Sequence, residues 1–213
     1  MNRSDTSDAG GKTSPHLCFV VEKLRIPDFF PLFQQGVAVS VHTGCSITTF
    51  LREQLGVSPD AIEKIQSIFL DGSAVDDLDA AIIRDGSVLA LSAAMPGLVG
   101  ATMRRGGRYS SFRSGVTHRE TEGQCASGEG FVQVKLFNLL MAELGPGLLA
   151  KGIYVTSSDL RDFLAARSGD FRRGWMQVIL DGKSIEAGSL NDTSWLDRSD
   201  RIFLSVTGRT GEE

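Results

Sequence analysis

Six residues with side chains suited to binding lie in a short glycine-rich stretch near the middle of the chain: Arg104, Arg105, Arg108, Tyr109, Phe112 and Arg113. Arginines donate charge-assisted hydrogen bonds to carboxylates and phosphates, and glycines expose backbone N–H groups to anions. Aromatic rings between arginines can stack on nucleic-acid bases. Leu98, Val99 and Met103, just upstream, can instead pack into another protein or a second copy of the chain. A flexible basic connector without a partner is the remaining interpretation.

The overall charge favours protein docking among these uses. The 213 residues carry a formal net charge of −4, so no global field attracts nucleic acid or an anionic membrane. We therefore expect the partner to be another protein, with a homodimer as one form of it. Nucleic acid and membrane are not expected as partners.

Catalytic and metal-binding patterns are not evident. The three histidines, His16, His42 and His118, stand in separate contexts without metal-ligand spacing. The three cysteines, Cys18, Cys45 and Cys125, lack close C-x-x-C pairs, which fits reduced thiols in the cytoplasm. Cys45 precedes a predicted helix, whose dipole could lower the pKa of its thiol, but no paired base is evident. We predict no enzyme activity, cofactor or metal.

An internal repeat indicates how the chain is organised around the basic stretch. Leu70-Asp71-Gly72 and Leu180-Asp181-Gly182 each join two apolar runs, as Asp-Gly does in a hairpin. An earlier match aligns 31–39 with 146–155, with one residue of slack. Both halves read as strand, turn, strand, helix, strand, turn and strand. The alternative is that Leu-Asp-Gly marks two unrelated turns.

The elements of both units follow from local patterns. In the second unit we predict a strand at 131–140, a loop through Gly145, Pro146 and Gly147, a strand at 152–155 and a helix over 156–167. In the first unit we predict strands at 17–24 and 36–41, a helix over 47–55 and a second short helix over 58–65.

The predicted fold class is α+β, with two tandem units that each place one main helix across a mixed sheet. The predicted boundaries are a disordered tail at 1–16, a first unit at 17–97, a Gly/Arg-rich linker at 98–129, a second unit at 130–208 and a short tail at 209–213.

Each unit resembles a ubiquitin-like β-grasp domain. The runs 68–75 and 83–91 are similar to the back half of sulfur-carrier proteins of the MoaD and ThiS type. That resemblance implies an adenylating activating enzyme as partner and a terminal Gly-Gly. This chain ends instead in Glu212 and Glu213, and its Gly106-Gly107 pair is internal, so carrier chemistry would require processing after Gly107.

The sequence thus predicts a cytoplasmic, non-catalytic adaptor that works through two β-grasp units and the linker. A sulfur-carrier relative processed at Gly107 is one alternative. An RNA- or nucleotide-binding accessory protein that uses the arginine-rich linker is the other.

Overall fold

The computed structural model describes residues 14–113, 115, 117–118, 127–167 and 169–210. Most of the predicted N-terminal tail, Cys125 and the last three residues lie outside this part. The chain divides into two compact units, one formed by Met1–Leu32 with Pro146–Glu213 and the other by Phe33–Gly145. We call them the terminal unit and the central unit. Across the described residues, no helix combines the length and the apolar character needed to cross a bilayer.

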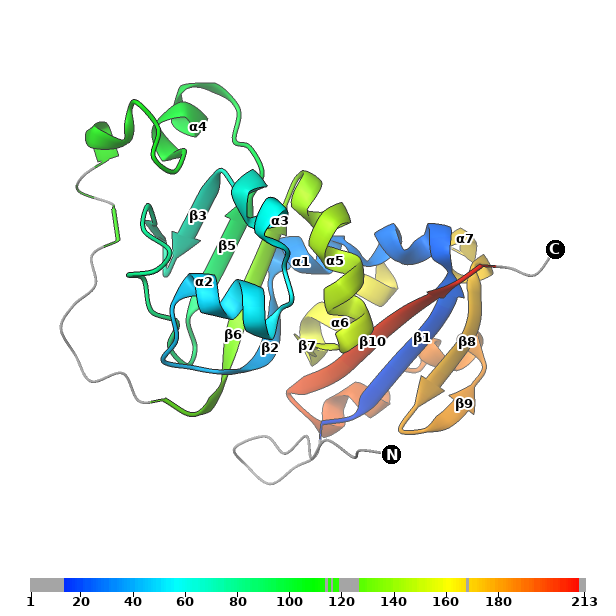
Figure 1. Cartoon of the computed structure of the whole chain (residues 1–213). Coiled ribbons are helices and arrows are strands. Elements are labelled where there is room, and N and C mark those ends of the chain that lie inside the picture. The colour runs from blue at the N-terminus through cyan, green and yellow to red at the C-terminus, as the bar shows by residue number, and fades with distance from the viewer. Residues whose placement is uncertain (1–13, 114, 116, 119–126, 168, 211–213) are drawn as a thin grey trace. The chain divides into compact units, whose positions relative to one another are not determined.

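The strands are assigned to a single ten-stranded mixed sheet in the order β4-β3-β5-β6-β2-β7-β10-β1-β8-β9 (Figure 1). The expectation of two separate β-grasp units in tandem is therefore wrong. The protein is α+β, but the first strand of each predicted repeat pairs with strands from the other half of the chain. β1 (His16–Glu22) pairs with the C-terminal β10 (Arg201–Arg209), and β6 (Glu129–Phe137) pairs with the N-terminal β2 (Val37–His42).

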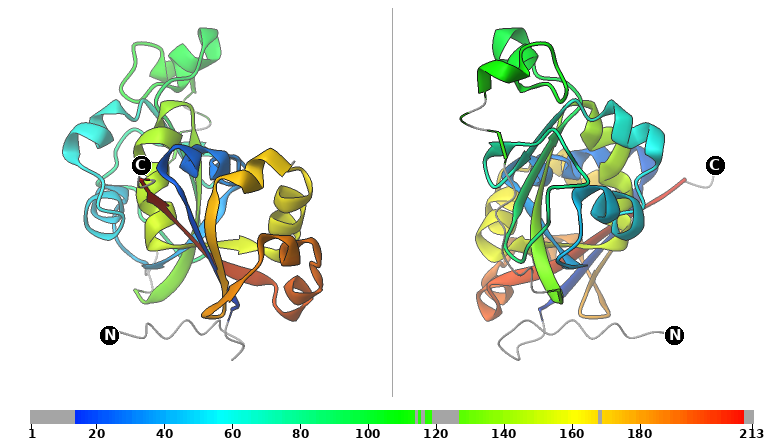
Figure 2. Two further views of the ribbon diagram at one scale, coloured as in Figure 1. Left: turned by 90° about the vertical axis from the view of Figure 1, so that its right-hand side faces the viewer. Right: turned by 60° about the vertical axis from the view of Figure 1, so that its left-hand side comes forward.

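The terminal unit builds its part of the sheet around β1, which is parallel to β10 and antiparallel to β8. These three strands lie side by side in Figures 1 and 2, and β7 is antiparallel to β10. Its other elements are η1 (Lys23–Phe29), β7 (Ile153–Thr156), α6 (Ser157–Ala165), α7 (Gly169–Arg173), β8 (Trp175–Leu180), β9 (Lys183–Ile185), η4 (Ala187–Asn191) and η5 (Ser194–Arg198).

Aromatic side chains fill the core of the terminal unit. The Phe29 ring centroid lies 5.2 Å from that of Phe19, 5.6 Å from that of Phe163 and 5.4 Å from that of Phe171. Trp175 completes the cluster, with centroids 4.8 Å from Phe19 and 5.0 Å from Phe171. Such tilted and edge-on pairs add to the stabilisation from apolar burial, so they fix η1, α6 and α7 on the strands.

The central unit pairs β6 antiparallel to β2 and parallel to β5, and β5 antiparallel to β3. Burial alternates along β6, with Val132, Val134 and Leu136 inward, as its period-two sequence predicts. Its other elements are α2 (Ile47–Thr49) continued by η2 (Phe50–Gln54), α3 (Pro59–Lys64), β3 (Ser67–Leu70), β4 (Ser73–Ala74), β5 (Val88–Ser92), α4 (Gly97–Met103) and η3 (Ser110–Arg113). The boundaries between the two units fall within α1 (Pro31–Gln35) and α5 (Leu139–Lys151).

Hydroxyl side chains begin the predicted helices as expected. Thr156 accepts a hydrogen bond from the Asp159 N–H at the start of α6, and Ser58 accepts one from the Ala61 N–H at the start of α3. Ser46 does the same for α2, with the Thr49 N–H as donor. The three helix starts are thus confirmed.

The predicted loop at Gly145–Gly147 is wrong, because α5 runs through it with Pro146 inside the helix. Leu140, Leu144, Leu148 and Leu149 recur at helical spacing and are all buried. Burial of this face outweighs the helix-breaking tendency of the Gly-Pro-Gly sequence, since most helical stability in proteins comes from packing.

The two Leu-Asp-Gly segments form the same turn. Asp71 and Gly72 have φ of 51° and 81°, and Asp181 and Gly182 have φ of 49° and 79°. Two successive positive φ angles are typical of the tight turn that joins antiparallel strands, here β3 to β4 and β8 to β9. The two turns therefore have the same local conformation, although the first strand of each predicted repeat pairs with the other half of the chain.

Candidate protein-binding surface

Residues 97–113, which we call the 97–113 segment, fold as part of the central unit. The segment begins with α4, turns at Gly106 with φ of 60° and ends with η3. The Arg105 N–H donates to the Gln66 carbonyl at 2.7 Å, which joins the segment to the start of β3. Of the predicted linker at 98–129, residues 98–103 and 110–113 are thus helical, and Arg105 is hydrogen-bonded to the rest of the unit.

Arg113 holds the segment in place from within. Its side chain is buried, and its Nη2 lies 2.6 Å from Asp76 Oδ1. Its Nε donates to the Thr102 carbonyl at 2.8 Å, and the same Asp76 oxygen accepts from the Gly106 N–H at 3.0 Å. One guanidinium and one carboxylate therefore join the middle and the C-terminal end of the segment to the turn after β4, so Arg113 lies inward rather than toward a partner.

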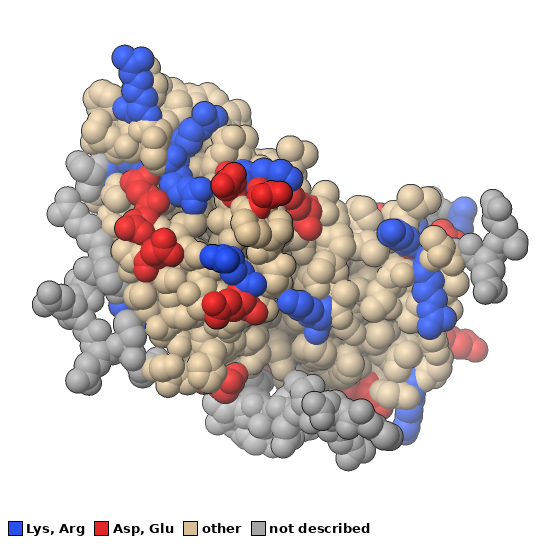
Figure 3. Space-filling model, in the orientation of Figure 1, with Lys and Arg blue, Asp and Glu red and all other residues tan. Residues whose placement is uncertain are grey.

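The other predicted binding residues lie mostly at the surface. Arg104, Arg108, Tyr109 and Phe112 are exposed, whereas Arg105 is half-buried. The Tyr109 and Phe112 ring centroids lie 6.1 Å apart, with their planes inclined by 31°. Figure 3 shows basic side chains among uncharged surface at the place where Figure 1 shows α4.

Apolar side chains on this segment are exposed to an unusual degree. Seven large hydrophobic side chains in the described part of the chain are well exposed, and four belong to the segment. They are Leu98 at 75%, Val99 at 61%, Tyr109 at 43% and Phe112 at 79%. Scattered apolar residues are normal on protein surfaces, and the grouping of four within one short segment makes this segment the candidate surface.

The Gly106-Gly107 pair lies inside this fold. The Gly107 N–H donates to the Arg104 carbonyl at 3.1 Å, and a Cβ added at Gly107 would lie 3.0 Å from the same oxygen. Processing after Gly107 would therefore have to open a hydrogen-bonded turn. The processing hypothesis stays a prediction.

The three histidines, Cys18 and Cys45, all within the described residues, form no assembled catalytic or metal site there. Within the described part of the chain, no group of three metal-ligating side chains comes together. Burial raises the pKa of the Cys45 thiol, so the suggested activation by the helix is not seen. His16 Nε2 lies 3.2 Å from Ser205 Oγ, but Asp181 accepts a hydrogen bond from the His16 backbone N–H. A serine–histidine–aspartate relay, in which the carboxylate orients the imidazole, is thus not formed.

Sequence reasoning also missed a cavity in the terminal unit. Arg25 and Arg167 lie far apart in sequence but line the same cavity. No short motif joins them, so only the pairing of the N-terminal and C-terminal segments could have indicated their proximity.

No family model matches the chain, and comparison with curated proteins and with solved structures found no match either. A functional assignment therefore has to be argued from the chain itself.

Proposed function

We propose that this protein is a non-catalytic interaction module that binds another protein through the 97–113 segment. The observation that carries the proposal is the grouping of Leu98, Val99, Tyr109 and Phe112 as exposed apolar side chains on one held segment. Fully burying an exposed apolar side chain is favourable by about 1.5–3 kcal/mol, and these four, which are partly exposed, would each contribute a fraction of that to a partner that covers them.

The charges beside these residues define the partner. Arg104 and Arg108 are exposed next to the apolar group and no carboxylate in the described residues forms an ion pair with either. A partner surface with an apolar centre and acidic side chains at its edge would satisfy both features. Because Arg113 already fixes the segment, binding needs little further ordering of the backbone.

The test is affinity capture from native cells with matched variants. We expect one or more proteins to bind the unaltered chain, to be lost with the double variant Leu98→Ser, Phe112→Ser, and to be kept with Leu139→Ser. Leu139 is the control because it is 76% exposed but lies outside the segment. Truncating central apolar contacts commonly costs more than 1 kcal/mol each, so two together should weaken binding by well over tenfold.

A reversal of charge checks the chemistry of the partner. Arg104→Glu with Arg108→Glu should release the same proteins, and added salt should weaken their binding. Identical recovery with all variants would refute the proposal. Self-association that Phe112→Ser abolishes would identify a second copy as partner, and co-purified nucleic acid or a chain ending at Gly107 would favour one of the two alternatives.

A further inference from the structure

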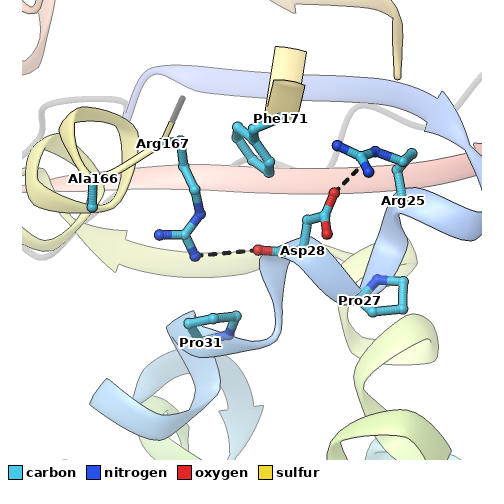
Figure 4. Close-up of a pocket in the computed structure, with 7 residues that line it drawn as sticks. All are labelled: Arg25, Pro27, Asp28, Pro31, Ala166, Arg167 and Phe171. Atoms are coloured by element: carbon cyan, nitrogen blue, oxygen red, sulfur yellow. Dashed lines mark hydrogen bonds and ion pairs between the residues drawn. The ribbon is translucent and has the colours of Figure 1, made fainter. Parts of the chain in front are cut away.

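The terminal unit contains an open cavity of about 490 Å³. It lies between η1, the start of α1, the residues after α6, and α7 (Figure 4). Its lining residues are Arg25, Pro27, Asp28, Pro31, Ala166, Arg167 and Phe171. Small-molecule sites are commonly concave and of a few hundred Å³. The lining of this one combines three charged side chains with proline, alanine and phenylalanine.

Arg167 is the distinctive residue of this cavity. Its guanidinium lies 4.0 Å from the ring centroid of Phe163 and 5.5 Å from that of Phe171, and its Nη2 donates to the Asp28 carbonyl at 3.3 Å. Stacking on aromatic rings holds the guanidinium plane in one orientation. Burial lowers the pKa of Arg167, which indicates that part of its hydration is already lost.

Arg167 has no carboxylate partner within the part of the chain that the structure describes. The Asp28 carboxylate instead pairs with Arg25, whose Nε lies 3.0 Å from Asp28 Oδ2. Figure 4 shows the Asp28 carboxylate turned toward Arg25, whereas its backbone carbonyl faces Arg167. An arginine has five N–H donors, so Arg167 keeps donors for a ligand after the bond to Asp28.

We propose that this cavity binds a small molecule with a single carboxylate, which accepts two hydrogen bonds from Arg167 while an apolar body lies against Phe171, Pro27 and Pro31. The planar fork of a guanidinium matches the two oxygens of a carboxylate. The ligand carboxylate supplies the ion-pair partner that Arg167 does not have among the described carboxylates. A phosphate dianion fits less well, because its second charge would face the Asp28 carboxylate.

Benzoate is the probe, and benzamide is its uncharged counterpart of the same shape. Titration of the full chain followed by amide NMR shifts should show saturable changes at Asp28, Ala166 and Phe171 with benzoate. Benzamide should bind at least tenfold more weakly, because a charge-assisted hydrogen bond contributes more than a neutral one. This comparison uses the unaltered chain and therefore does not depend on any variant folding.

Variants locate the charge that matters. Arg167→Gln should weaken benzoate binding by at least tenfold, and Arg167→Lys should have an intermediate effect, since it keeps the charge but loses the fork. Arg172→Gln is the control, because Arg172 lies 5.9 Å over the Trp175 ring and does not line the cavity. Equal binding of benzamide and benzoate, unchanged affinity in Arg167→Gln, or absence of saturable shifts would overturn the proposal. Tighter binding of inorganic phosphate than of benzoate would also overturn it.

Discussion

Replacing Arg113 with glutamine should release the 97–113 segment from the central unit. The change removes the buried guanidinium that contacts Asp76, Thr102 and Thr117, and it leaves the Asp76 carboxylate without its cation. Removing one partner of a buried ion pair typically costs about 3–5 kcal/mol. The Asp76 side chain is 37% exposed, so water can hydrate the remaining carboxylate and the lower end, about 3 kcal/mol, is expected.

Amide hydrogen exchange measures this opening residue by residue. The reporters are the N–H groups of Arg105, Gly106 and His118, which donate to Gln66, Asp76 and Ala74 respectively. A loss of about 3 kcal/mol in the local opening free energy should speed their exchange by about a hundredfold.

The control for this experiment is Arg104→Gln, because Arg104 is exposed and contributes only its backbone carbonyl to the Arg113 contacts. Amides of β6 should exchange at the same rate in both variants, since these amides lie in the sheet. Unchanged exchange at the reporters in Arg113→Gln would refute the role given to Arg113. An equal rise at every amide would show instead that the residue supports the whole unit.

Three further predictions concern single sites. Burial lowers the pKa of His16 below its ordinary value, so the unfolded chain binds a proton more readily than the folded one. The free energy of unfolding should therefore fall as the pH is lowered through about 6.5. Urea unfolding measured across this pH range should show a smaller fall in His16→Gln. Gly152→Ala should destabilise the protein by more than about 1 kcal/mol in thermal unfolding, because φ is 98° and the new Cβ would lie 2.1 Å from the Phe203 ring. Gly188→Ala is the control and should leave the stability unchanged, because no atom lies within 4 Å of its new Cβ. Alkylation of Cys45 at neutral pH should be several-fold slower than in the urea-unfolded chain, since its raised pKa leaves less thiolate; equal rates would contradict this.

The parts of the fold set by local interactions could be predicted from the sequence. Ser58 and Thr156 begin helices because their hydroxyls accept backbone N–H groups a few residues away. The Asp-Gly turns at 71–72 and 181–182 follow from the tolerance of these residues for positive φ. Each of these features depends on fewer than five consecutive residues, and none depends on the rest of the fold.

The pairing of the strands could not be predicted in the same way. The runs that form β1 and β6 are both apolar and strand-forming. Their local pattern therefore does not determine which half of the sheet each of them joins. Their choice of partner depends on contacts between distant parts of the chain, such as His16 with Phe203. The helix across Pro146 was missed for a related reason, because packing of its leucine face outweighs the local helix-breaking residues.

Composition located the candidate surface but could not assign a role to each residue in it. The sequence gives no reason to separate the six predicted binding residues into buried and exposed ones. Arg113 is nevertheless buried, whereas Phe112 beside it is 79% exposed. The difference arises from Asp76, which lies outside the segment and provides the carboxylate for Arg113. The cavity at Arg167 gave no local signal at all, because its walls come from both ends of the chain.

The exchange of first strands has a consequence for biosynthesis. The central unit, Phe33–Gly145, is one continuous stretch and can fold once it has emerged from the ribosome. β1 emerges before it but pairs with β8 and β10, so it has to wait until residues 175–209 have been translated. During that interval Leu17, Phe19 and Val21, all fully buried in the finished protein, lack the strands that flank them in the sheet. The nascent chain therefore carries an apolar strand whose exposed side chains favour aggregation until β8 and β10 have been made.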